Sequence, residues 1–271
     1  MTEQAITDDL GHPVGVRPGP RRLVSLVPNL SELLWDWGFA DRLVGVTEWC
    51  VAPPGGFPDA QRVRGTKNPD VAAIVAMAPD LVIANEEENR AHDVERLRAA
   101  GIAVHVTRVR SLAALPGSLG RLALALGEPS AATSLIAAIE QARSGLAPPP
   151  TGRRRVACAV WRDAPERAGP DEGWWLLGRD TYAADLLTTV GVEVLPPDPD
   201  GRYPRCTFAE LAAFAPELLL LPDEPYAFGP DDVRELERAG LDARLVDGTA
   251  LWWWGPRTPR AITELAPLAV C

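Results

Sequence analysis

Tryptophan is the residue type whose placement most suggests chemistry in this chain. Six of the nine tryptophans lie in the second half of the sequence, and three of them are consecutive, Trp252–Trp254. Gly255 and Pro256 follow this triplet, and three consecutive residues of a loop cannot all face one core. At least one ring is therefore expected to be exposed or to line a binding site, where a flat ring gives a large contact area at low entropic cost.

No arrangement of nucleophiles, acids or bases forms a recognisable catalytic motif. The patterns GxSxG, GxxxxGK[ST] and HExxH do not occur, and no GxGxxG follows an apolar run. We therefore predict that the chain is not an enzyme. The alternative is a catalytic site whose carboxylates the sequence alone does not pair, because a fold does not determine a function.

Residue types that bind metals are scattered. Of the three histidines, His12, His92 and His105, only His92 stands near a loop that could bind a ligand. A zinc site needs several histidines, cysteines or carboxylates that converge on one ion, and the four cysteines show no CxxC spacing. We expect no cofactor of the protein's own. A metal is expected only inside a chelate that brings its own ligands, with His92 as the one candidate axial ligand.

The composition is that of a soluble globular protein with two domains. The chain has 271 residues, of which 46% are hydrophobic and 24% charged, and its net charge is −10. So acidic a chain repels nucleic acid, and Arg153–Arg155 is interpreted as a solvated linker end. No run approaches the roughly 20 apolar residues of a membrane span. Because residues 1–20 do not read as a signal peptide, we expect a cytoplasmic protein.

An internal repeat organises the chain. Three pairs of segments match in the same order at displacements of 132 to 139 positions: Arg21–Val27 with Arg153–Val160, Ala78–Ile83 with Ala215–Leu220, and Asp93–Ile102 with Asp232–Leu241. Chance could supply one such match but hardly three in order. The repeat predicts two halves that fold as related lobes.

Apolar runs alternate with helical patterns in each half, which favours parallel sheets covered by helices on both faces. The short apolar runs expected to form strands are Leu23–Val27, Leu43–Val46, Leu81–Ala84, Ile102–Val106 and Val156–Val160.

Helix starts and stops are also readable. Asn29 with Glu32 predicts a capping box at the first helix, which ends at Gly38. Asn68 followed by Pro69 predicts the start of another. Between the halves, residues 119–126 and 131–139 have Ala and Leu at helical spacing, which predicts a stiff connection.

These patterns predict an α/β fold of two Rossmann-like, duplicated lobes with parallel sheets, joined by a single long backbone helix. The predicted parts are a disordered tail (1–20), an N-terminal α/β lobe (21–118), a connecting helix with a Pro-rich linker (119–151) and a C-terminal α/β lobe (152–271).

Five segments resemble a known family: Arg22–Glu32, Val44–Thr47, Gly65–Asp70, Ala78–Val82 and Thr258–Arg260. They are similar to the helical-backbone substrate-binding proteins of iron-siderophore, haem and vitamin B12 uptake, and most similar to the B12-binding branch. The resemblance implies two lobes joined by one helix, a ligand in the cleft between them, and delivery of that ligand to an ABC transporter. Those relatives are exported, so the missing signal peptide favours a cytoplasmic carrier or sensor.

Ligands of open α/β sheets bind outside the carboxyl ends of the strands, so the loops after the apolar runs are the candidate site. The residues predicted to bind the ligand are Pro28, Asn29, Trp49, Thr66, Lys67, Asn68, Asn85, Glu86, Trp161, Trp174, Trp175, Trp252, Trp253 and Trp254. Thr66–Asn68 and Trp252–Trp254 are expected to face each other across the cleft.

The leading hypothesis is non-catalytic binding of a bulky small molecule with flat or apolar faces. A corrinoid such as cobalamin comes first, and haem or an iron-siderophore next. The alternatives are an enzyme that uses the same cleft and a cytoplasmic protein-interaction module whose tryptophan loop is the contact surface. Aromatic walls with neutral polar groups would mark a binding site, whereas an acid or base with a strongly shifted pKa would mark a catalytic one.

Overall fold

The structure is a computed structural model that describes residues 6–16, 19–148, 152–163, 171–196 and 201–270. It is an α/β fold that divides into two compact units. The first unit comprises residues 1–109 and 114–137, and the second comprises residues 110–113 and 138–271. None of the helices within the described residues is long and apolar enough to cross a membrane.

The first unit is built on a five-stranded sheet with the order β3-β2-β1-β4-β5, in which every neighbouring pair is parallel. Its strands are β1 (Leu23–Ser25), β2 (Leu43–Val46), β3 (Gln61–Arg62), β4 (Leu81–Asn85) and β5 (Val104–Thr107). All side chains of β1, β4 and β5 are buried, which explains why these strands appear in the sequence as short and mostly apolar runs.

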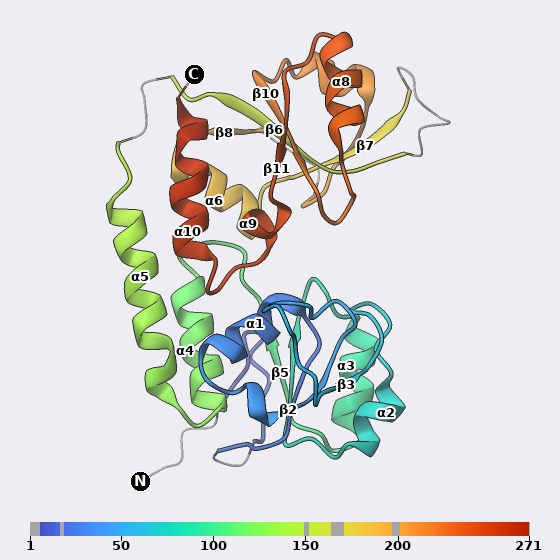
Figure 1. Ribbon diagram of the computed structural model, residues 1–271, viewed down its shortest axis with the longest axis vertical. Coiled ribbons are helices and arrows are strands. Elements are labelled where there is room, and N and C mark those ends of the chain that lie inside the picture. The colour runs from blue at the N-terminus through green and yellow to red at the C-terminus, as the bar shows by residue number, and fades with distance from the viewer. Residues whose placement is uncertain (1–5, 17–18, 149–151, 164–170, 197–200, 271) are drawn as a thin grey trace. The chain divides into compact units, whose positions relative to one another are not determined.

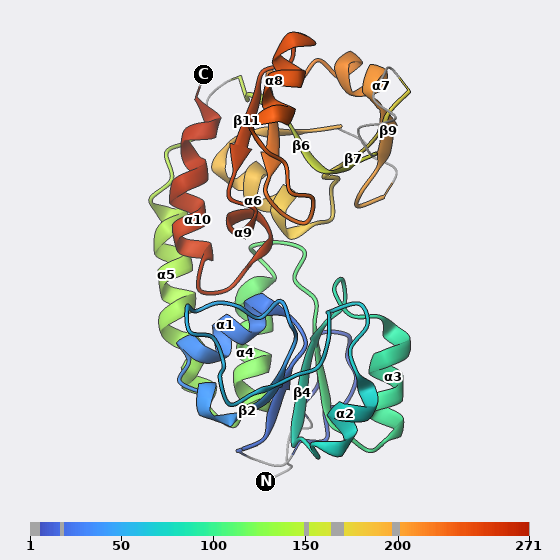
Figure 2. The same cartoon turned by 45° about the vertical axis from the view of Figure 1, so that its right-hand side comes forward.

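Helices cover both faces of this sheet (Figure 1). Helices α1 and α4 lie on one side, and α2 and α3 lie on the other (Figures 1 and 2). The helices of the unit are α1 (Pro28–Asp36), η1 (Ala40–Arg42), α2 (Val71–Ala76), α3 (Ala91–Ala99), α4 (Leu115–Ala125) and η2 (Pro129–Ala132).

Two helix starts differ from the sequence prediction. Helix α1 begins at Pro28 with Val27 as its N-cap and no side-chain cap, so the capping box predicted for Asn29 is wrong. Proline is favoured in the first helical turn, because its missing N–H has no partner there in any case. Helix α2 begins at Val71, and its cap is Asp70, whose carboxylate accepts the N–H of Ala73. The stronger cap thus lies two residues after Asn68.

The chain passes from the first unit to the second through α5 (Thr133–Ser144), since the division between the units falls within this helix, after residue 137. The short segment 110–113 also belongs to the second unit, although it precedes α4. A helix as the connection agrees with the fold predicted from the sequence.

The second sheet is mixed. Its path is β11-β10-β6-β7-β9, and β8 also pairs with β6. The strands are β6 (Arg155–Arg162), β7 (Gly173–Leu176), β8 (Glu193–Leu195), β9 (Arg205–Thr207), β10 (Leu218–Pro222) and β11 (Ala243–Val246). The pairs among β8, β6, β10 and β11 are parallel, as predicted, whereas β7 runs antiparallel to both β6 and β9.

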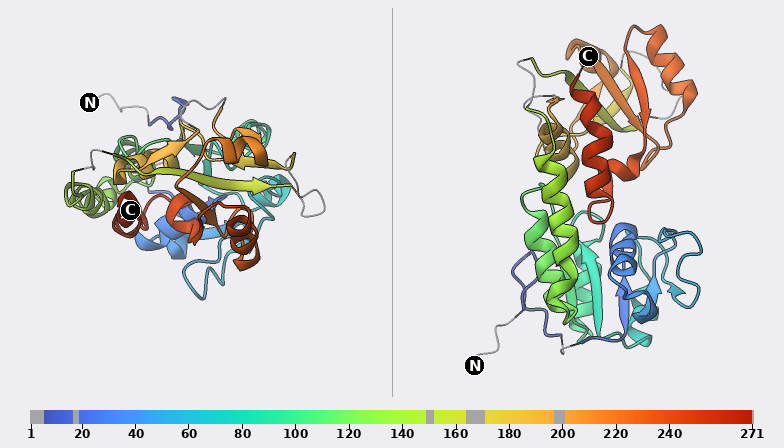
Figure 3. Two further views of the ribbon diagram at one scale, coloured as in Figure 1. Left: turned by 90° about the horizontal axis from the view of Figure 1, so that it is seen from above. Right: turned by 60° about the vertical axis from the view of Figure 1, so that its left-hand side comes forward.

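The antiparallel part exists because β6 extends beyond the ends of its parallel neighbours β8 and β10. Residues 155–158 of β6 pair with β8 and β10, and residues 159–162 pair with β7. In the view from above, β6 is the long yellow-green strand that crosses the second unit (Figure 3). The helices of this unit are α6 (Tyr182–Val190), α7 (Phe208–Ala213), α8 (Pro230–Arg238), α9 (Gly248–Trp252), α10 (Thr258–Leu265) and η4 (Ala266–Ala269).

The duplication predicted from the sequence is visible in the strand orders. In the first sheet β2, β1, β4 and β5 are neighbours in that order, and in the second sheet β8, β6, β10 and β11 follow the same order. Helices α3 and α8, whose sequences match, each lead into the last of these strands. The pair β7 and β9 is therefore an addition to the second unit.

The prediction of a disordered tail is wrong for residues 6–16. Residues 6–16 pack on the first unit, and Thr7 and Pro13 form a β-bridge. Asp8 and Val14 are each only 2% exposed. The Asp8 carboxylate closes its own turn by accepting the N–H groups of Leu10 and His12, and it also pairs with Arg98 of α3 at 2.6 Å. Side-chain partners on the folded unit therefore order a segment whose composition reads as a tail.

Candidate ligand-binding site

A single buried amide links three loops at the carboxyl end of the first sheet. The Nδ2 of Asn89 donates to the carbonyl of Leu26 at 3.3 Å and to that of Thr66 at 2.9 Å, and its Oδ1 accepts the N–H of Asn85 at 2.8 Å. These residues follow β1, β3 and end β4, so the structure brings the predicted loops together as parallel strands require. Asn89 is 6% exposed, so its bonds are shielded from water.

Trp49 and Asn68 both lie against Gly65. A Cβ at Gly65 would stand 2.7 Å from Oδ1 of Asn68 and 3.2 Å from Nε1 of Trp49, so only glycine permits this approach. The Trp49 side chain is nevertheless 63% exposed. Lys67, next in the loop, donates from Nζ to the carbonyl of Glu87. An exposed indole, an amide and an ammonium group thus stand side by side on supported loops.

A buried polar network holds the loop that carries this indole. The hydroxyl of Ser31 lies 2.9 Å from that of Ser25 and 3.0 Å from the sulfur of Cys50, and the hydroxyl of Thr47 lies 3.1 Å from the same sulfur. Arg62 donates to the carbonyls of Thr47 and Cys50 at 2.9 and 3.0 Å. Burial raises the pKa of the Cys50 thiol, so the thiol stays protonated and belongs to the scaffold.

Two predicted site residues of this unit are buried instead. Asn29 is 5% exposed and Asn85 is 6% exposed. The Asn85 side chain donates to the Thr107 hydroxyl at 3.2 Å and accepts the N–H groups of Glu87 and Glu88. The Asn85 side chain therefore stabilises the acidic loop after β4 and is not available to contact a ligand.

In the second unit, Glu224 contacts two of the predicted tryptophans. Trp252 donates from Nε1 to the Glu224 carbonyl at 2.7 Å, and the Trp253 side chain donates to the Glu224 carboxylate. The Arg257 guanidinium lies over the Trp253 ring at 4.6 Å and donates to the hydroxyl of Thr249. Both indoles are half-buried. The loops after β10 and β11 therefore form one aromatic and charged surface.

The third tryptophan of the triplet is part of the core. Trp254 is 5% exposed, so it cannot meet a ligand in the way that the sequence analysis predicts. Consecutive residues that leave α9 point in different directions, which is why one of the three rings turns inward.

Trp161 and Trp175 face outward on the antiparallel part of the second sheet. They are register partners across β6 and β7, and Trp161 is 47% exposed. Trp161 meets Tyr226 edge-on at 5.2 Å. On the next strand, the Arg205 guanidinium lies 5.2 Å from the Trp175 ring. These rings form a row on one face of the sheet.

Trp174 belongs to the opposite face of that sheet and is fully buried, so its predicted ligand contact is wrong. The guanidinium of Arg162 lies 4.7 Å from its ring. Arg162 is itself buried and pairs with Glu172 at 2.7 Å, with Asp232 at 2.9 Å and with Glu235 at 2.9 Å. Burial alone would lower the pKa of Arg162, but its bonds to Glu235 and Glu172 raise it, so the cation is permanent and fixes the sheet extension.

The family model described as periplasmic binding protein matches residues 23–240. The chain belongs to this family. It is therefore a non-catalytic substrate-binding protein, in agreement with the resemblance seen in the sequence. YvrC of Bacillus subtilis (strain 168), an uncharacterized ABC transporter substrate-binding lipoprotein, is 23% identical over 227 residues, which make up 80% of this chain and 68% of that relative.

Other relatives match a shorter part of this periplasmic binding protein. The vitamin B12-binding protein of Pectobacterium carotovorum subsp. carotovorum (strain PC1) is 29% identical over 104 residues, which are 38% of this chain and 37% of the relative. The vitamin B12-binding protein of Vibrio campbellii (strain ATCC BAA-1116) is 30% identical over 105 residues, or 38% of each chain. The matches to vitamin B12-binding proteins thus span little more than a third of those proteins.

Solved structures show the same fold. The periplasmic heme-binding protein RhuT from Roseiflexus sp. RS-1 superposes with a TM-score of 0.76 at 23% identity, and covers 92% of this chain and 98% of its own. The periplasmic vitamin B12 binding protein BtuF of Vibrio cholerae superposes with a TM-score of 0.75 at 18% identity, and covers 93% and 98%. At these identities the likeness concerns the fold.

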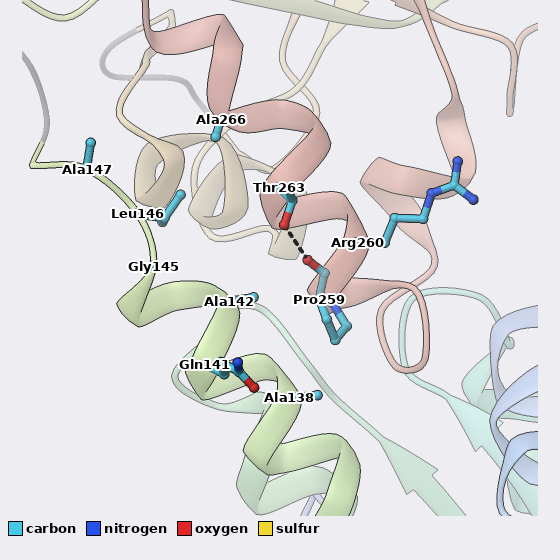
Figure 4. A pocket seen from close by; sticks show the side chains of 10 residues that line it. All are labelled: Ala138, Gln141, Ala142, Gly145, Leu146, Ala147, Pro259, Arg260, Thr263 and Ala266. Carbon is cyan, nitrogen blue, oxygen red and sulfur yellow. Dashed lines mark hydrogen bonds between the residues drawn. The ribbon is translucent and has the colours of Figure 1, made fainter.

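A hollow of about 600 Å³ lies away from all predicted site residues of the binding protein, between α5 and α10 (Figure 4). Small side chains such as Ala138, Ala142 and Ala266 line it, and Thr263 donates to the carbonyl of Pro259 within α10. It offers a ligand neither aromatic rings nor converging polar groups, so we place the candidate site at the loops and not here.

Sequence reasoning missed Glu224 and Asn89 as organisers of the site. A signal was present for Glu224, because Asp223-Glu224 directly follow the apolar run of β10, where the site of such a fold is expected. Asn89 lay at the end of an acidic loop and gave no sign that it reaches two other loops. Among the described residues, no group of three or more histidines, cysteines and acids could hold a metal ion.

Proposed function

We propose that this periplasmic binding protein binds a bulky, flat small molecule, with a corrinoid as the first candidate and haem or an iron-siderophore as the next. The observation that carries the proposal is the presence of accessible indoles on supported carboxyl-end loops in each unit. Trp49 serves the first unit, and Trp252 and Trp253 serve the second. Exposed rings that the fold holds in place give contact area without a large ordering cost.

The charge of these loops favours a ligand without carboxylates. Glu86–Glu88 directly follow β4, and Asp223 and Glu224 directly follow β10. Haem propionates and many siderophores are anionic and would be repelled there, whereas the amide side chains of a corrinoid donate hydrogen bonds to carboxylates. Lys67 is engaged by the carbonyl of Glu87 and Arg257 by Thr249 and Trp253.

The histidines support the same order of candidates. His105 is fully buried in the first sheet, and His12 lies 3.7 Å from the Asp8 carboxylate on the N-terminal segment. His92 is exposed on α3. A pre-chelated metal that needs no protein ligand fits this distribution better than haem with a histidine axial ligand.

The test is a titration of cobinamide, cobalamin, haemin and a ferric hydroxamate against the wild type, followed by quenching of tryptophan fluorescence. Trp49→Ala removes an exposed ring of the candidate site, and Trp35→Ala removes one of similar accessibility that packs on Phe57 outside these loops. We expect a corrinoid to bind and Trp49→Ala to weaken it at least tenfold, which corresponds to about 1.4 kcal/mol. Equal binding by the two variants, or no quenching by any ligand, would count against the proposal.

Delivery of the ligand to a membrane transporter is part of the proposal, since relatives carry that role in their names. The cytoplasmic location and a sensor role stay predictions. Cell fractionation, followed with an antibody against the chain, measures the compartment of the protein. Binding of the purified protein to a membrane extract of the host measures any transporter-bound fraction.

A further inference from the structure

We propose that Glu224 is the positioning residue of the ligand-binding indoles in the second unit, holding Trp252 and Trp253 in the orientation that receives the ligand. The role of the two rings in binding rests on the proposed function. Their orientation by Glu224 is a property of the free protein and can be measured without any ligand.

Glu224 engages both rings through different atoms. Its carbonyl accepts Nε1–H of Trp252 at 2.7 Å, and its carboxylate accepts the side-chain donor of Trp253. Each indole has a single hydrogen-bond donor, so Glu224 takes up the polar edge of both rings. A tryptophan side chain has two rotatable bonds, and a bond at Nε1 in addition to packing fixes its plane. The ring faces are then left for contact.

The position of Glu224 is fixed by the start of α9. A Cβ at Gly248 would lie 2.5 Å from Cγ of Glu224 and 3.1 Å from both its backbone nitrogen and Oδ1 of Asp223. Gly248 also donates its N–H to that Asp223 oxygen at 2.8 Å. The helix that ends at Trp252 therefore packs directly on Glu224, and glycine is the residue that leaves room for it.

Trp253 is held from a second direction. The Arg257 guanidinium lies 4.6 Å from the centre of its ring, and Arg257 is tied to Thr249 at 2.5 Å. One ring face is thus covered by a cation and the ring edge is bound by a carboxylate. A cation over an indole stabilises the pair by electrostatics with the ring face, so neither Glu224 nor Arg257 is an idle surface charge.

The carboxylate that performs this role is sensitive to acid. Burial raises the pKa of Glu224; the bond from Trp253 lowers it, Asp223 and Asp247 raise it, and Arg257 lowers it. The net direction is upward, so Glu224 takes up its proton at a higher pH than an ordinary glutamate. The protonated group loses the charge that strengthens the Trp253 bond. The orientation of Trp253 should therefore loosen as the pH falls through this raised pKa.

The experiment compares three variants with the wild type. Glu224→Gln keeps an acceptor oxygen for Trp253 but cannot titrate. Glu224→Ala removes the carboxylate that accepts from Trp253 and leaves the backbone carbonyl that accepts from Trp252. Gly248→Ala forces the glutamate side chain away. Glu264→Gln on α10 is the matched control, because Glu264 is half-exposed and pairs with Arg260 at 2.7 Å. The readouts are near-ultraviolet circular dichroism, tryptophan emission of the free protein between pH 4 and 8, and the affinity for cobinamide.

We expect the wild type and the Glu264→Gln control to lose tryptophan dichroism as the pH falls, and Glu224→Gln to keep it with a flat pH profile. Glu224→Ala and Gly248→Ala should show the loosened signal at every pH and bind cobinamide about tenfold more weakly. Unchanged spectra in Glu224→Ala, or an unchanged pH profile in Glu224→Gln, would overturn the inference. If the spectra behave as expected but the wild type does not bind cobinamide, the positioning role stands and the corrinoid proposal fails.

Discussion

Ala78 and Ala215 adopt the same left-handed backbone conformation, with φ of 46° and 47°, although they lie in different units. Each precedes a proline and then an acid, Asp80 or Glu217. The Asp80 carboxylate accepts the N–H groups of the two arginines just before β1, and the Glu217 carboxylate accepts the Arg155 N–H at the start of β6. The duplication has thus kept a strained turn together with the bonds that hold it.

We predict that Ala215→Gly stabilises the protein slightly. A left-handed backbone costs a residue with a Cβ about 1–2 kcal/mol, and glycine avoids this cost. The extra freedom of glycine in the unfolded chain offsets about 0.4–1 kcal/mol of the gain. A net gain of about 0.5 kcal/mol in the free energy of unfolding should appear in urea denaturation. Ala212→Gly in α7, where helical backbone favours alanine, should instead lose about 1 kcal/mol. A loss in both variants would mean that the turn is not strained.

The N-terminal segment is predicted to contribute to stability through Asp9. Its side chain is 1% exposed and accepts the Arg108 N–H at 2.7 Å, the Ser118 hydroxyl at 2.5 Å and Nε of Arg121 at 2.7 Å. Asp9→Ala leaves these donors without their acceptor and should lower the free energy of unfolding by about 2–3 kcal/mol. Urea denaturation measures this change.

Asp59→Ala is the control for this prediction, because Asp59 is an exposed acid on the same unit. It should change the free energy of unfolding by less than about 0.5 kcal/mol. Limited trypsin digestion adds a local readout, since loss of the Asp9 carboxylate frees the Arg108 backbone N–H that it holds. Equal stability of the two variants would show that the segment is dispensable.

His105 is predicted to make the protein acid-sensitive. It is fully buried, and both of its ring nitrogens are without a hydrogen-bond partner. Burial lowers the pKa of His105 from 6.5 to about 4. The charges of Asp9 and Asp8 raise this pKa and the charge of Arg121 lowers it, so the net change is downward. Between pH 6.5 and about 4 the unfolded chain binds a proton that the folded chain does not. Its contribution to stability is therefore complete above pH 6.5 and declines as the pH falls toward 4, by about 3 kcal/mol in all.

His105→Leu should flatten this part of the stability curve while other groups keep their effects. The measurement is the difference between the free energies of unfolding of wild type and variant at pH 7, 5.5 and 4.5. His92→Leu, which alters an exposed histidine, should follow the wild-type curve. A parallel decline in His105→Leu would assign the acid sensitivity to other groups.

Much of the fold could be predicted from the sequence because its parallel strands are buried on both faces. The strand β10 appears as an unbroken apolar run, β4 is apolar up to its last residue, Asn85, and β1 contains one small polar residue, Ser25. The sheet extension of β7 and β9 could not be predicted in this way. These strands are three or four residues long, include Gly173 and Arg205, and depend on the overhang of β6 rather than on their own composition.

The structure brings together the first-unit loops that the sequence selects, but the orientations of their side chains could be predicted less well. The rule that ligands meet the carboxyl ends of strands selects segments, but the orientation of each side chain depends on its partners. Trp174 and Trp175 are neighbours on one strand, so they point to opposite faces, and only Trp175 remains accessible. Asn85 lies at the carboxyl end of β4, as expected, but its short side chain accepts the N–H groups of Glu87 and Glu88 in the loop that follows.

The tryptophans after α9 are predicted to separate binding from folding. Trp253 is half-buried and Trp254 is 5% exposed, so they differ in what they contribute although they are adjacent. Trp253→Ala should leave the fold intact and weaken cobinamide binding by at least tenfold, through lost stacking of roughly 1–2 kcal/mol and lost contact area. Trp254→Ala removes a core ring and should lower the free energy of unfolding by about 3–5 kcal/mol.

Thermal unfolding followed by circular dichroism measures stability, and fluorescence titration measures affinity. A Trp253→Ala variant that unfolds, or one that binds as tightly as the wild type, would remove Trp253 from the binding surface.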